Sequence, residues 1–187
     1  ETHTAYGSVF WAFDAFLEQL VRLDFQQPHG PGSMDHSIAA VRRFADVKLR
    51  GGDAAGRDVH AGMVVDDATR TLFVASPADG AVLAVGADTG AFAESARGGA
   101  YPAYSSRLPS FEYSVFLCAE QRVFASGLAT PTGLAARDGV LYVAEHETGG
   151  VVAFEIASGA RLANASTGRP RALQGLSFSP AGELYAV

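Results

Sequence analysis

The stretch that decides the fold is Leu141-Tyr142-Val143-Ala144-Glu145, followed after a short polar turn by Val151-Val152-Ala153-Phe154. Both runs are brief and almost entirely apolar, and the turn between them contains Gly149. Short apolar runs bounded by polar and glycine residues are typical of β-strands, and this spacing predicts a β-hairpin.

The same arrangement occurs at two earlier places in the chain, and all three copies align without gaps. One copy covers residues 10–23 and the other covers residues 72–85. A fourth copy begins at Leu184, 43 residues after Leu141. Repeats of about 40 residues that hold four short strands each are typical of β-propeller blades.

The sequence around each hairpin supplies the other two strands of a blade. A lead-in strand precedes three of the hairpins and begins with a glycine in each case, at Gly62, Gly133 and Gly175. Residues 123–125 and 161–163 are the candidates for an outer, fourth strand. The predicted unit is therefore an antiparallel sheet of four strands joined by turns rich in Gly, Asp, Ser and Pro.

One segment also fits a helix. Phe10, Phe13, Leu17, Leu20 and Val21 form an apolar stripe with helical spacing. We predict a hairpin there, because the segment matches the two clearer copies in spacing, and the structure decides between the two interpretations.

We therefore expect an all-β fold with three to four propeller blades, covering roughly 1–50, 58–128, 129–170 and an incomplete 171–187. Propellers close into rings of about four to eight blades. An open arc would leave apolar blade faces and strand edges uncovered. We therefore expect the chain to be part of a larger closed propeller.

The lead-in Thr132-Gly133-Leu134-Ala135-Ala136, followed by residues 141–145, resembles the NHL-repeat family of six-bladed propellers. The Gly-His and Trp-Asp signatures of WD repeats are absent from this repeat. The resemblance extends over nearly the whole chain and implies a propeller, whereas propellers serve many different functions.

A distant resemblance to the peptidylglycine amidating lyase propellers implies an enzyme with histidine-bound zinc at its central channel. That lyase motif has a histidine directly before the Gly-Leu of the lead-in strand. Here Ala61, Thr132 and Gln174 occupy those positions, and His60 lies one residue earlier. The lyase ligands therefore do not transfer residue by residue.

Four residues form the main group of potential metal ligands: His29, Asp35, His36 and His60. Imidazole and carboxylate together suit zinc, and carboxylate also suits calcium. The spacing matches no established zinc signature, and hydrogen bonds within a Gly/Pro-rich loop are the alternative role for these side chains.

Five further positions complete the candidates. The insertion at roughly residues 93–112 and its flank contain Tyr101, Tyr104 and Tyr113, which form a binding surface or pack their own loop onto the blades. His146 lies in a hairpin turn, where we expect exposure to solvent. The lone cysteine, Cys118, is expected to be a small buried residue on a strand, unless it pairs outside this stretch.

Composition narrows the class of partner. The net charge is −6 and no basic stripe is present, which argues against nucleic-acid binding. No apolar run approaches the roughly 20 residues of a membrane span. Asn164-Ala165-Ser166 is a potential glycosylation site and favours an extracellular or cell-surface setting.

No nucleophile motif, paired catalytic carboxylates or phosphate loop is evident in the sequence. The sequence therefore favours a non-catalytic module that binds other proteins or the rest of its own propeller. The alternative is a lyase-like enzyme with a histidine-bound metal.

Overall fold

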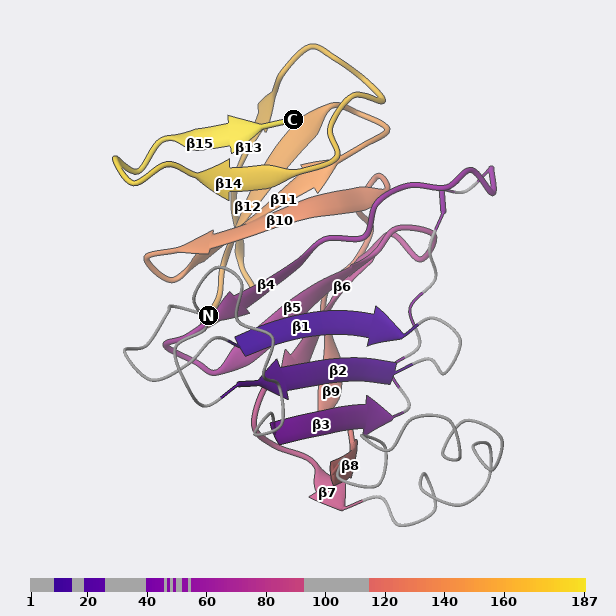
Figure 1. Ribbon diagram of the computed structural model, residues 1–187. Coiled ribbons are helices and arrows are strands. Elements are labelled where there is room, and N and C mark those ends of the chain that lie inside the picture. The colour runs from indigo at the N-terminus through magenta and orange to yellow at the C-terminus, as the bar shows by residue number, and fades with distance from the viewer. Residues whose placement is uncertain are drawn as a thin grey trace, which may run out of the picture. The chain divides into compact units, whose positions relative to one another are not determined.

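The computed structural model describes residues 9–14, 19–25, 40–45, 47, 49, 52–53, 55–92 and 115–187 (Figure 1). These residues form strands, turns and loops, and no helix among them could span a membrane. The chain divides into two compact units: unit 1 holds residues 1–48 and 88–120, and unit 2 holds residues 49–87 and 121–187.

Unit 1 contains one five-stranded sheet in the order β1-β2-β3-β8-β7. The strands are β1 (Val9–Asp14), β2 (Gln19–Asp24), β3 (Ala40–Ala45), β7 (Ala91–Phe92) and β8 (Val115–Cys118). The first two strands pair antiparallel, from Val9 opposite Asp24 to Asp14 opposite Gln19. The hairpin interpretation of this segment is therefore confirmed, and the helical one is wrong. Leu20 and Phe44 are fully buried in this sheet.

The sheet of unit 1 departs from the pattern expected of a blade. Strand β8 pairs parallel with β3, from Arg42 opposite Val115 to Ala45 opposite Cys118. Strands β7 and β8 lie in sequence between the third and fourth strands of a sheet in unit 2. The chain between β6 and β9 thus supplies two strands, β7 and β8, to a different sheet from the one that β6 and β9 belong to.

Unit 2 contains two complete four-stranded antiparallel sheets and one pair of strands. The first sheet is β4 (Met63–Asp66), β5 (Thr71–Ser76), β6 (Ala81–Gly86) and β9 (Gln121–Ala125). The second is β10 (Pro131–Arg137), β11 (Val140–Glu145), β12 (Gly150–Glu155) and β13 (Arg161–Ser166). The pair is β14 (Leu176–Phe178) and β15 (Leu184–Ala186). The hairpins and both candidate outer strands are thereby confirmed.

The middle strands of the two complete sheets, β5, β6, β11 and β12, are largely apolar because they are covered within a stack of sheets. Phe73, Val82, Leu141 and Val152 are fully buried in one continuous core. Phe124 links the two complete sheets, because its ring lies 4.9 Å from that of Phe73 and 6.0 Å from that of Phe154. Such edge-on ring pairs add to the stability gained from burying the rings.

The lead-in glycines set the spacing of the sheets. The Gly62 N–H donates to the Thr132 carbonyl at 2.9 Å, which joins the starts of two lead-in segments. A Cβ atom on Gly133 would lie 2.6 Å from the backbone of Gly175 and Leu176. Figure 1 accordingly shows β10 beside β4 and β14 beside β10. Glycine is therefore required here by backbone contact between neighbouring sheets.

The structure confirms an all-β fold of several antiparallel sheets. The NHL type and the larger closed ring are part of the proposed function. The proposed blade boundaries remain a prediction.

Gly133→Ala should destabilise unit 2 by about 3 kcal/mol, because the new methyl group meets backbone that must shift. Gly139→Ala is the matched control. Gly139 has a φ of 76° with no atom near its would-be Cβ, so this change costs only backbone strain, about 1 kcal/mol. Chemical denaturation of both variants measures the difference, and equal losses would contradict close contact at Gly133.

Candidate functional site

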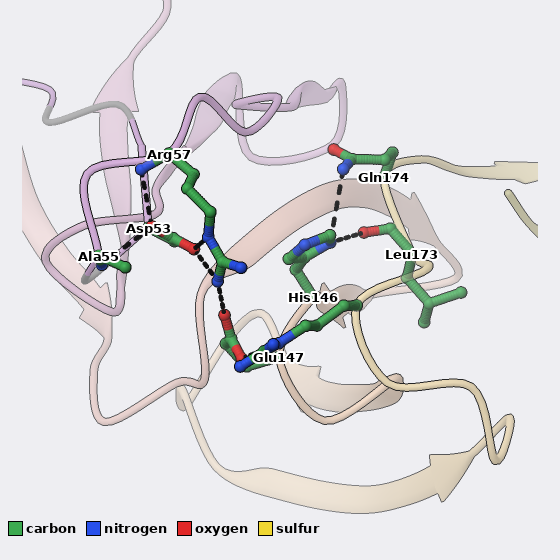
Figure 2. Close-up of polar contacts among 8 residues, drawn as sticks. Asp53, Ala55, Arg57, His146, Glu147, Leu173 and Gln174 are labelled. Carbon is green, nitrogen blue, oxygen red and sulfur yellow. Dashed lines mark hydrogen bonds and ion pairs between the residues drawn. The ribbon is translucent and has the colours of Figure 1, made fainter.

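A cluster of polar side chains lies where three segments of unit 2 meet (Figure 2). The segments are the loop before β4, the turn between β11 and β12, and the loop between β13 and β14. We call it the polar cluster, and its members are Asp53, Arg57, Glu145, His146, Glu147, Arg171 and Gln174. It is built from residues up to about 120 positions apart in the sequence.

Among the buried members of the polar cluster, His146 is the one whose neutral ring can carry its hydrogen on either nitrogen. Its contacts show which nitrogen carries it. Its side chain is 8% exposed, and Nδ1 lies 3.0 Å from the Leu173 carbonyl oxygen. A carbonyl oxygen can only accept, so an unprotonated Nδ1 would place its lone pair against another lone pair. Nδ1 therefore carries the hydrogen, and in the neutral ring the lone pair resides on Nε2.

The Leu173 carbonyl is itself held in place. It also accepts a hydrogen bond from the buried Thr132 hydroxyl at 3.0 Å. Both of its lone pairs are thereby engaged. A fixed acceptor fixes the plane of the imidazole that donates to it.

Gln174 lies against the same edge of the ring. Its Nε2 is 3.4 Å from His146 Nδ1, while its Oε1 accepts the backbone N–H of His60 at 3.2 Å. Figure 2 shows the amide and the Leu173 carbonyl on one side of the imidazole. With the hydrogen on Nδ1 both atoms of this 3.4 Å contact are donors, so Gln174 is hydrogen-bonded to the loop before β4 and only packs beside the histidine.

Glu145 anchors the turn that carries His146. This side chain is 9% exposed, and its Oε1 accepts the Ala129 N–H at 3.0 Å. Its Oε2 accepts the Thr148 hydroxyl at 3.1 Å. The buried carboxylate is therefore hydrogen-bonded on both oxygens, as a buried charge requires.

An ion-pair network covers the outer side of the cluster. Arg57 pairs with Asp53 and donates to Glu147 Oε1 at 3.0 Å, and Arg171 Nε donates to Glu147 Oε2 at 2.9 Å. The Arg57 side-chain hydrogen bond, with backbone N–H donors of Arg57 and Ala55, holds the pKa of Asp53 below its ordinary value. The same carboxylate raises the pKa of Arg57.

The residues that the sequence predicted to bind metal or partners lie in different places, and the structure describes only some of them. His60 is exposed and reaches the polar cluster through its backbone N–H. Asn164 lies on the exposed outer strand β13, and its modification remains a prediction. The remaining six lie outside the described residues: His29, Asp35, His36, Tyr101, Tyr104 and Tyr113.

Two expectations about single residues are wrong. His146 is buried, not exposed to solvent, because its turn lies on the loops before β10 and β14 and its ring donates to Leu173. Cys118 is exposed, although it does lie on a strand, β8. No disulfide partner for it occurs in the part of the chain that the structure describes.

A resident metal does not fit the polar cluster. Among the described residues, no three or more His, Cys, Asp or Glu side chains gather closely enough to hold an ion. The carboxylates of Asp53 and Glu147 are paired with arginine, and that of Glu145 is hydrogen-bonded. These side chains are therefore engaged with one another and with the backbone.

The repeat contains a signal that could have identified His146 as a buried residue. In the gapless alignment His146 corresponds to Pro77, and the structure buries both. A histidine at a position that packs an apolar ring elsewhere in the repeat must find a buried partner. The partner, Leu173, belongs to the next repeat and could not be found from spacing alone.

Comparison with solved structures supports the propeller-like fold. A candidate 6-phosphogluconolactonase from Bacteroides uniformis superimposes with a TM-score of 0.52 and 14% identity, over 99% of this chain and 48% of its own. A luciferin-regenerating enzyme and a gluconolactonase from Xanthomonas campestris give TM-scores of 0.46 and 0.44, with 13% and 16% identity. Those two matches cover 98% and 92% of this chain, and 54% and 51% of theirs.

The chain thus spans about half the length of these structures. No family model matches the sequence. No curated protein matches it either. At this identity the structural likeness establishes the fold alone.

The comparison corrects the functional expectation from the sequence. We expected a non-catalytic interaction module, whereas the Bacteroides neighbour is described as a candidate 6-phosphogluconolactonase, which does not support that expectation. The polar cluster combines side chains from separate repeats, so it has no local signature in the sequence.

Asp53→Asn should make the stability of unit 2 less dependent on pH. The lowered pKa of Asp53 means that its charge stabilises the fold above the ordinary value of 3.8, and that this contribution disappears on acidification. The wild-type melting temperature should therefore fall more steeply with pH below about 4 than that of the variant.

Arg57→Ala and the double variant provide the control for this prediction. If the pair acts as a unit, the double variant should be little less stable at neutral pH than either single variant. Simple additivity of the two losses would show that the carboxylate and the guanidinium act independently.

Proposed function

We propose that this chain belongs to a propeller hydrolase that opens a lactone, with His146 as the general base. The observation that carries the proposal is the fixed hydrogen on Nδ1, which leaves Nε2 of a buried, oriented imidazole as the basic atom. Histidine is the side chain most often used as a general base near neutral pH.

The chemistry needs one water molecule and no other reactant. Nε2 takes a proton from the water while the water oxygen bonds to the lactone carbonyl carbon. The bond from that carbon to the ring oxygen then breaks, and the ring oxygen takes the proton back from Nε2. The product is the open-chain hydroxy acid, and His146 returns to its neutral form.

The choice of a lactone is supported by the Bacteroides structure, which is described as a candidate 6-phosphogluconolactonase. An ester of similar size presents the same carbonyl chemistry and would be the nearest alternative substrate. The orientation of the base by a third group, here the Leu173 carbonyl, is an arrangement that also serves hydrolases on other folds.

The proposal includes the larger architecture. We propose that the sheets are NHL-type blades and that they work within a larger closed ring. The recurring lead-in glycines and hairpins support the first part. Coverage of only 48% of the Bacteroides structure supports the second. The secreted setting, with Asn164 glycosylated, stays a prediction.

His146→Asn tests the base directly. Asparagine keeps an N–H donor close to the Nδ1 position but has no basic nitrogen, so kcat/KM should fall by about 10²- to 10⁴-fold. Hydrolysis of glucono-1,5-lactone, its 6-phosphate and δ-valerolactone can be followed with a pH indicator. Circular dichroism checks that the variant is folded.

Glu155→Gln is the control, because Glu155 is an exposed residue of strand β12 outside the polar cluster. It should hydrolyse the lactones at the wild-type rate. Wild-type activity in His146→Asn would overturn the role of the base. A wild-type chain that opens none of the lactones would overturn the substrate class.

Metal analysis of the purified chain tests the predicted ligands His29, Asp35, His36 and His60. A site of this kind should retain close to one zinc or calcium ion per chain through dialysis, and His60→Ala should lose most of it. Mass spectrometry of the digested protein measures the metal. A metal-free wild-type chain, or full retention in His60→Ala, would remove this part of the proposal.

A further inference from the structure

We infer that Thr130 and Arg171 are positioning residues that hold His146 from both sides, an inference that rests on the proposed function. The His146 N–H donates to the Thr130 carbonyl at 2.9 Å. The His146 carbonyl accepts from the Arg171 N–H at 2.7 Å. Together with the Nδ1 bond to Leu173, these contacts fix the residue at its two backbone groups and its ring.

Both partners adopt an unusual backbone conformation. Thr130 has a φ of 57° and Arg171 a φ of 61°, in the left-handed region that favours glycine. For a β-branched residue such as threonine this conformation is a marked outlier. Thr130 is also buried, at 6% exposed, so its strain persists inside the packed structure.

Local turn chemistry does not require this strain at Thr130. Among the described residues two other non-glycine residues have positive φ, Arg70 and Asp138, and each lies in an exposed turn joining two adjacent strands. A left-handed residue is ordinary in such turns. Thr130 instead lies in the loop before β10, directly after a tight bend closed by its own N–H on the Leu128 carbonyl at 3.1 Å.

The strained bend presents its carbonyl to the turn that carries His146. Neighbouring contacts hold the same loop against the same turn: Ala129 N–H bonds to the Glu145 carboxylate, and Glu147 N–H bonds to the Ala129 carbonyl at 3.3 Å. Strained backbone of this kind persists where the surroundings fix it, and it occurs often at functional sites. Thr130, which is buried on one flank of His146, matches that description.

Arg171 adds a second connection on the other flank. Its backbone N–H holds the His146 carbonyl while its Nε donates to Glu147 at 2.9 Å. The strained residue thus holds two consecutive residues of the turn. A relaxed backbone at either flank would leave the base free to shift relative to Leu173.

Thr130→Gly tests the inference, because glycine adopts the left-handed conformation without strain and also leaves it easily. The melting temperature should change little, since relief of strain and added flexibility oppose each other. The kcat for lactone opening should fall about tenfold with KM unchanged, because a displaced base is costly to the reaction step.

Asp138→Gly is the matched control. It removes the same kind of strain from the turn between β10 and β11, outside the polar cluster. Its melting temperature should change in the same way as that of Thr130→Gly, and its kcat should equal the wild-type value. A merely structural role for Thr130 predicts that the two variants behave alike in kcat.

Nuclear magnetic resonance of the imidazole supplies a readout that does not depend on activity. The hydrogen-bonded Nδ1–H of His146 should give a slowly exchanging ¹⁵N-coupled signal in the wild type and in Asp138→Gly. That signal should be lost or broadened in Thr130→Gly.

The two proposals fail separately. Loss of the Nδ1–H signal in Thr130→Gly, in a chain that opens no lactone, would support positioning and overturn the proposed reaction. An active chain in which Thr130→Gly keeps both the signal and the wild-type kcat would overturn positioning and leave the reaction standing.

Discussion

The fold of unit 2 depends on close contact between backbones at glycine positions. Gly62, Gly133 and Gly175 begin the lead-in segments, and a side chain on either of the first two would collide with the backbone of the next sheet. A second layer of such contacts lies at the hairpin turns, where Cβ atoms on Gly80 and Gly149 would lie 2.7 Å from the Leu128 carbonyl and 2.3 Å from the Arg169 carbonyl. Each sheet is therefore held in register with the next at two levels, and the turn carrying His146 is fixed by the second.

That register explains how the polar cluster can form without a local motif. His146 takes the position that Pro77 occupies in the preceding sheet, and both residues are buried. Replacing an apolar ring by imidazole there leaves a polar atom that must be satisfied. The Leu173 carbonyl satisfies it, because the Gly149 contact brings the loop before β14 close to the turn. Packing between sheets therefore sets the tautomer of the histidine.

The parts of the structure that sequence could predict are those with a repeating local pattern. Hairpins at 72–85 and 141–154 and the outer strands near Val123 and Leu162 follow from spacing and composition. The parallel pairing of β3 with β8 could not be predicted, because the inserted segment has no counterpart in the other repeats. Burial of His146 was missed for a related reason: polar turns are usually exposed, and only contacts with two distant loops bury this one.

The relative strength of the contacts around His146 shows which of them orient its imidazole. Arg57 and Arg171 are 51% and 61% exposed in their side chains, and ion pairs of that exposure contribute little to stability because water competes for them. The bonds to Thr130, Arg171 and Leu173 instead use backbone groups whose positions are set by the strands and glycine contacts on either side. The backbone contacts therefore set the orientation of the imidazole.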